Sequence, residues 1–155
     1  NASAPSADEL RALGADAFVA LDQPREALVD AFRAEISRGL DIVLDYVWGA
    51  PAEAFFAATA GHGAGGAAPR IRFINVGGMA GPTVTLPAAA LRSSGLELLG
   101  SGLGSVSHST LVLCIAELFA ATKAAGFMIA TEAFPLSDVS AAWTRDTPAR
   151  IVFTR

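Results

Sequence analysis

Short apolar segments of strand length alternate along this chain with longer segments whose apolar residues recur at helical spacing. This alternation is the sequence pattern of β-α-β units, in which helices connect the neighbouring strands of a parallel sheet. We therefore predict an α/β fold. The expected strands cover 16–22, 40–48, 70–76, 96–101, 128–134 and 150–153, and the expected helices cover 7–13, 24–39, 51–60, 108–125 and 138–145.

Capping residues mark the ends of two of these helices. Ser6 is followed three residues later by Glu9, a spacing that predicts a capping box at a helix start. Pro24 suits the first turn of the second helix, and Gly39 supplies its C-terminal stop. Within 40–48, Ile42, Val43 and Leu44 are apolar on consecutive positions, which predicts a central strand covered on both faces.

The composition fits one folded unit in the cytoplasm. Of 155 residues, 52% are hydrophobic and 17% are charged, which supplies a core and excludes a wholly disordered chain. The net charge is −4 and basic residues do not cluster, so a nucleic-acid partner is not expected. A single cysteine cannot form an internal disulfide, and neither a signal peptide nor an uninterrupted apolar stretch of membrane-spanning length is present. We predict a cytoplasmic protein with no membrane partner.

Three of the expected strands end at glycines. Gly49 follows 40–48, Gly77 and Gly78 follow 70–76, and the cluster G-S-G-L-G at 100–104 follows 96–101. In open parallel sheets, ligands lie at the carboxyl ends of the strands, where glycine allows the backbone to approach a ligand closely. The shared pattern therefore predicts a ligand site at this edge of the sheet.

Each side chain beside these glycines can be interpreted either as part of the ligand site or as structural. Tyr46 and Trp48 could wall a ring-shaped ligand or fill the sheet edge, and Met79 carries the same ambiguity. Asp41 and Asp45 could act as a general base, although a carboxylate at a strand end more often binds a backbone amide. The sequence identifies no catalytic residue.

Other candidate motifs favour structural roles. The literal G-x-G-x-x-G at 61–66 follows a helix and precedes a strand, the reverse of the order in a dinucleotide fingerprint, so we interpret it as a linker. His62, His108 and Cys114 have no metal-ligand spacing, so no metal site is expected.

Five segments carry a family resemblance in their order and spacing. They resemble the C-terminal half of the medium-chain dehydrogenase/reductase superfamily, closest to its quinone oxidoreductase and zinc-type alcohol dehydrogenase-like branch. The segments are L-R-A-L-G-A-D at 10–16, G-L-D-I-V-L-D-Y-V-W-G at 39–49, I-R-F-I-N-V-G-G-M-A-G at 71–81, R-S-S-G-L-E-L-L-G-S-G-L-G-S at 92–105, and A-R-I-V-F-T-R at 149–155.

The resemblance implies an incomplete Rossmann-like, doubly wound parallel sheet whose first β-α-β unit lies upstream of Asn1. Residues 1–126 would form a partial NAD(P)-binding domain, and residues 127–155 an α/β segment that returns to the substrate domain. The chain would hold only the nicotinamide side of NADP or NAD, and no zinc. The residues implied for cofactor binding are Tyr46, Val47, Trp48, Gly49, Asn75, Val76, Gly77, Gly78, Met79, Ser101, Gly102 and Leu103.

The implied function is that of a fragment of an NAD(P)H-dependent oxidoreductase. The intact parent would transfer hydride to a small quinone, enone or carbonyl substrate, whereas the fragment alone would be catalytically silent. The alternative is a non-catalytic cofactor-domain module that forms a homodimer through the edge strand at 95–101, because an apolar strand edge is a template for pairing.

Overall fold

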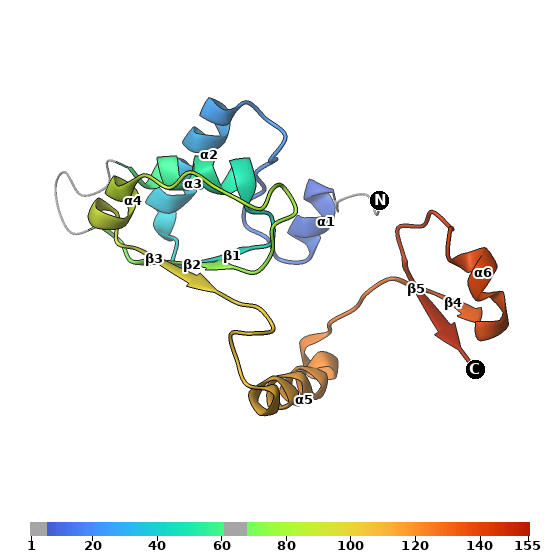
Figure 1. Cartoon of the computed structure of the whole chain (residues 1–155). Helices are drawn as coiled ribbons and strands as arrows, with labels where there is room; N and C mark the ends of the chain where they lie inside the picture. The colour runs from blue at the N-terminus through green and yellow to red at the C-terminus, as the bar shows by residue number, and fades with distance from the viewer. Residues whose placement is uncertain (1–5, 61–67) are drawn as a thin grey trace. The chain divides into compact units, whose positions relative to one another are not determined.

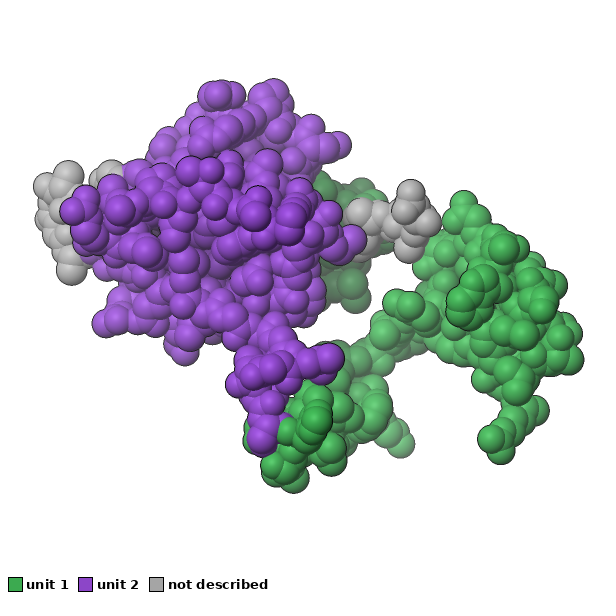
Figure 2. All heavy atoms as spheres, viewed as in Figure 1, with its two compact units in different colours: residues 1–18, 108–155 green, residues 19–107 purple. Residues whose placement is uncertain are grey.

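A computed structural model describes residues 6–60 and 68–155. The chain divides into two compact units, which are coloured separately in Figure 2: unit 1 comprises residues 1–18 and 108–155, and unit 2 comprises residues 19–107. The G-x-G-x-x-G motif at 61–66, with His62, lies outside the described residues.

Unit 2 contains a three-stranded parallel sheet with the strand order β1-β2-β3. β2 is therefore the central strand, and the sequence was wrong in giving the 40–48 segment that place. Figure 1 shows the helices of this unit on one side of the sheet. The elements are α2 (Arg25–Gly39), β1 (Ile42–Asp45), α3 (Gly49–Thr59), β2 (Ile71–Asn75), α4 (Ala88–Ser93) and β3 (Leu96–Gly100).

Aromatic side chains form the core between these helices and the sheet. Phe55 and Phe56 of α3 pack against Phe73 of β2, with ring centroids 5.3 and 5.1 Å apart. Phe32 of α2 meets Phe55 edge-on, with centroids 5.6 Å apart. The apolar spacing of α2 explains this packing, because residues four positions apart share one face of a helix.

The opposite face of the sheet is uncovered within unit 2. Ile42 and Leu44 of β1 are 49% and 61% exposed, so the expected burial of this strand on both faces is wrong within the unit. In the register of the sheet, Leu44 lies beside Ile74 and Ile74 lies beside Leu99. These three side chains form an apolar row across all three strands of this face. We call this side the open face.

Three expected strands differ from the structure. The strand expected at 128–134 begins three residues later and covers Thr131–Pro135. The segment 16–22 has strand composition but forms no strand, because strands need hydrogen-bonded neighbours and no strand of the described residues pairs with it. The Ala20 carbonyl accepts a hydrogen bond from the side-chain amide of Gln23. β1 ends at Asp45 rather than at Trp48, because the chain turns sharply there and Trp48 adopts a left-handed backbone with φ 57°.

The described residues of unit 1 form two short paired strands and three α-helices. β4 and β5 pair in parallel as a separate two-stranded sheet. The helix expected at 138–145 is a short 3-10 turn followed by one helical turn. Ser137, the serine immediately before the expected helix, does not cap it, because its hydroxyl donates to the Asp138 side chain. The elements are α1 (Ala7–Ala12), α5 (His108–Ala125), β4 (Thr131–Pro135), η1 (Leu136–Asp138), α6 (Val139–Ala142) and β5 (Arg150–Thr154).

α5 is the most exposed helix of unit 1. It has no buried residue, and its apolar side chains, Leu118 and Phe119 among them, face outward. Within the described residues it is also the one helix whose 18-residue length and mean hydropathy of 1.2 meet the requirement for crossing a membrane, by length and composition alone.

Candidate ligand site at the carboxyl edge of the sheet

The ends of the three parallel strands of unit 2 lie level with one another. Asp45 at the end of β1 is in register with Asn75 of β2, which is in register with Gly100 of β3. The amide of Ser101 continues this line by donating to the Asn75 carbonyl at 2.8 Å. The structure therefore brings the glycine clusters that the sequence placed at strand ends to one edge of one sheet.

The first of these clusters is organised by the Asp45 carboxylate. Asp45 is only 8% exposed, and its Oδ1 accepts hydrogen bonds from the backbone amides of Val47 at 2.9 Å and Trp48 at 3.0 Å. Asp45 was interpreted either as a general base or as a carboxylate that binds backbone amides, and in the structure it binds backbone amides. The turn that follows leads directly into α3.

The backbones of the first and second clusters are in direct contact. A Cβ added at Gly77 would lie 2.6 Å from the Tyr46 carbonyl oxygen, and one added at Gly49 would lie 2.6 Å from the Ala80 carbonyl oxygen. Side chains of any size are excluded at this spacing. Sequence reasoning expected glycine here for a ligand's approach, but these two glycines serve the approach of the two loops to each other.

Main-chain hydrogen bonds connect the same two loops. The amides of Val76 and Gly77 both donate to the Asp45 carbonyl, at 2.7 and 3.1 Å. Ala80 donates to the Val47 carbonyl at 2.7 Å. Ala80 was not among the residues expected at the site, and only the G-G-M-A-G run at 77–81 could have signalled that this loop folds back on the first.

Asn75 bridges the two loops with its side chain. Its Nδ2 donates to the Gly77 carbonyl at 2.7 Å and lies 3.4 Å from Asp45 Oδ2. The residue is half-buried at the end of the central strand.

The aromatic and apolar residues of the site divide into two groups. The ring of Trp48 packs on Phe56 and Phe73, at centroid distances of 6.0 and 6.2 Å, so it belongs to the core. Tyr46, Met79 and Leu103 are exposed. The structure thus resolves the ambiguity of Trp48 in favour of packing and leaves three exposed side chains on the loops at the strand ends.

The third cluster, after β3, is open. A Cβ added at Gly102 or at Gly104 would meet no atom within 4 Å. Ser105 closes the turn, because its hydroxyl donates to the Gly102 carbonyl at 2.7 Å and lies 3.0 Å from the Gly102 amide. This loop has room for another molecule beside its backbone, unlike the loops that contain Gly49 and Gly77.

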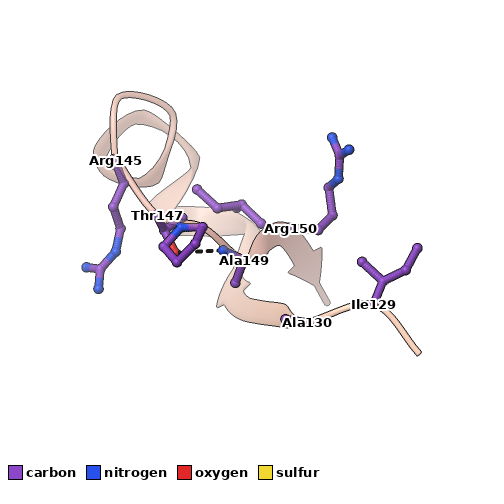
Figure 3. A pocket seen from close by; sticks show the side chains of 8 residues that line it. Ile129, Ala130, Arg145, Thr147, Ala149 and Arg150 are labelled. Atoms are coloured by element: carbon purple, nitrogen blue, oxygen red, sulfur yellow. Dashed lines mark hydrogen bonds between the residues drawn. The ribbon is translucent and has the colours of Figure 1, made fainter. Parts of the chain in front are cut away.

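The remaining candidates form no second site. His108 and Cys114 are both exposed on α5, and no group of three metal-binding side chains occurs within the part of the chain that the structure describes. A hollow of about 420 Å³ in unit 1 has two arginines in its lining, Arg145 and Arg150, whose side chains point away from one another (Figure 3). Arg145 is bound to Glu132 at 2.8 Å, so the hollow offers no converging charges.

Comparisons with known proteins bear on the fold. No protein-family model matches the chain, and no curated protein matches it either. A solved structure, the crystal structure of AibC, matches with a TM-score of 0.65 and 20% sequence identity. The match covers 96% of this chain and 40% of the AibC chain, so this chain spans less than half of that protein's length. A likeness at this identity concerns the fold alone, and the chain has a mixed α/β fold with parallel sheets.

Proposed function

We propose that this chain is the cofactor-binding part of an NAD(P)H-dependent oxidoreductase of the medium-chain dehydrogenase/reductase superfamily, close to the quinone oxidoreductases. Residues 1–126 would belong to a Rossmann-like, doubly wound domain, and residues 127–155 to the return toward a substrate domain. The whole protein would act in the cytoplasm on a small quinone, enone or carbonyl compound, without nucleic acid, membrane or a zinc ion held by this chain.

One observation carries the proposal: the three strand-end loops of unit 2 meet at one carboxyl edge, with Asp45, Asn75 and Gly100 in register. Such edges are where α/β sheets bind ligands. The nicotinamide half of NADP or NAD fits the character of this edge, because exposed Tyr46 and Met79 can lie against a ring and the loop at Gly102 leaves room for one.

Positioning is the contribution that these residues would make. The bound cofactor supplies the hydride, while the protein holds the ring and excludes water from it. The Asp45 and Asn75 hydrogen bonds fix the first two loops, and the main-chain groups near Gly102 would hold the ring's carboxamide. None of these side chains serves as a proton donor in the proposal.

Nicotinamide mononucleotide is the appropriate probe, because it contains only the half of the cofactor that this edge would hold. We expect its addition to shift the amide NMR signals of Gly77, Gly78 and Gly102. Gly102→Val should weaken this binding about tenfold, which corresponds to about 1.4 kcal/mol, by filling the open space. Gly104→Val is the matched control, since its Cβ position is equally open and Gly104 is not among the residues implied for cofactor binding.

Two results would contradict the proposed nicotinamide site. Unchanged glycine signals at millimolar nicotinamide mononucleotide would remove the cofactor assignment. Equal weakening by Gly102→Val and Gly104→Val would mean that the open space at Gly102 does not hold the ring.

A homodimer is the second candidate, and the position of β3 favours it. β3 is an edge strand of the sheet, and Leu98 and Leu99 in it are exposed. Unpaired strand edges with few charges pair readily with another chain. We propose pairing through residues 95–101; Leu98→Lys should then convert the dimer to a monomer in light scattering, whereas a wild-type protein that is monomeric at high concentration excludes the pairing.

A further inference from the structure

We propose that Asp45 is a positioning residue that couples the loop after β1 to the loop after β2, so that a ligand held by either loop orders both. The ligand in this statement rests on the proposed function. The coupling itself is a property of the two loops and can be measured without any ligand.

Asp45 is placed to act on both loops at once. The residue is 8% exposed, and its carboxylate accepts hydrogen bonds from the amides of Val47 and Trp48 on its own loop and from the side-chain Nδ2 of Asn75 on the neighbouring strand. A buried carboxylate needs such donors, because loss of water around a charge is otherwise strongly unfavourable. The same group therefore ties the ends of two strands together.

The first loop has a conformation that depends on these bonds. Trp48 has φ 57° and ψ −154°, a backbone conformation that side-chain-bearing residues rarely adopt. Such residues keep it only where the surroundings enforce it. Here Asp45 holds the Trp48 amide while Phe56 and Phe73 hold its ring.

The second loop is built on the first. The amides of Met79 and Ala80 donate to the carbonyls of Tyr46 and Val47, at 3.3 and 2.7 Å. When the turn at residues 46–48 moves, these two acceptors move with it. A change at Asp45 should therefore be felt four to five residues beyond Asn75, at positions that Asp45 does not touch.

Asp45→Asn tests this with a change of one atom. An asparagine offers one acceptor oxygen where the carboxylate offers two, and its amide would face either the Trp48 amide or Asn75 Nδ2, which are both donors. Asp41→Asn is the matched control, because Asp41 is an exposed carboxylate immediately before the same strand and the charge change is identical.

Amide hydrogen exchange measured by NMR is the readout. We expect Asp45→Asn to accelerate exchange at Met79 and Ala80 about tenfold while the amides within β2 and β3 change less than twofold, and Asp41→Asn to change neither. Acceleration confined to Val47 and Trp48, or equal acceleration throughout unit 2, overturns the coupling. Should Asp45→Asn not fold, Asn75→Ala decides the same question in reverse, through accelerated exchange at Val47 and Trp48.

Nicotinamide mononucleotide separates this inference from the proposed function. If the wild type does not bind it, the cofactor assignment fails and the exchange data alone decide the coupling. If the wild type binds it, Asp45→Asn should weaken binding about tenfold. Unchanged affinity in a folded Asp45→Asn protein would overturn the claim that the coupled loops order the ligand.

Discussion

Replacement of Phe56 by alanine should remove much of the stability of unit 2. Phe56 is fully buried, and its ring contacts those of Trp48, Phe55 and Phe73, with centroids 6.0, 6.4 and 5.1 Å away. Transfer of the side chain out of water contributes about 2–3 kcal/mol. The cavity and the lost edge-on ring contacts bring the expected loss to about 4 kcal/mol.

Against the roughly 5–15 kcal/mol that hold a domain folded, this loss is large. For a unit of about 90 residues it corresponds to a decrease of roughly 15–30 °C in Tm. Urea unfolding followed by far-UV circular dichroism would measure it. Leu44→Ala on the open face is the control, with an expected loss below about 1 kcal/mol. Similar losses for both variants would refute the assignment of core and open face.

Two further predictions concern unit 1. Ser6→Ala should accelerate amide exchange in α1 roughly fivefold, because Ser6 and Glu9 form a reciprocal capping box. Hydrogen bonds from the backbone amide of Ser6 and then from its hydroxyl hold the pKa of Glu9 below its ordinary 4.5, so the cap should act fully above pH 4.5 and weaken as the pH falls through the lowered pKa. Glu9→Gln should abolish this pH dependence. Cys114 is exposed on α5, so Ellman's reagent should modify it in the native protein as fast as in urea, and strong protection would show that another surface covers the helix.

Local signals predicted most of the helices correctly. The expected helix 24–39 matches α2 (Arg25–Gly39) to within one residue, because Pro24, which is the N-cap, and Gly39 act on the backbone beside them. The capping box at Ser6 and Glu9 also formed as its spacing predicted. Signals of this kind depend on a few neighbouring residues, and the sequence displays all of them.

The remaining errors come from interactions between distant parts of the chain. Segment 16–22 has the residues of a strand but lacks a neighbour with which to pair, and no local pattern reveals that. The sequence placed Gly77 correctly just after a strand, whereas β1 ends four residues before Gly49. The contacts of Gly77 with the Tyr46 carbonyl and of Gly49 with the Ala80 carbonyl each join residues 31 positions apart, which no local pattern displays. The distance between two such loops is known only from the folded structure.

Each unit carries one of the chain's two tryptophans, and this gives the protein two internal optical probes. Trp48 is half-buried among phenylalanine rings in unit 2, whereas Trp143 in unit 1 is 78% exposed. Their fluorescence emission maxima should therefore differ, with Trp48 emitting at a shorter wavelength than Trp143. Two single-tryptophan variants, each measured alone, would let the melting of each unit be followed separately, with no attached dye.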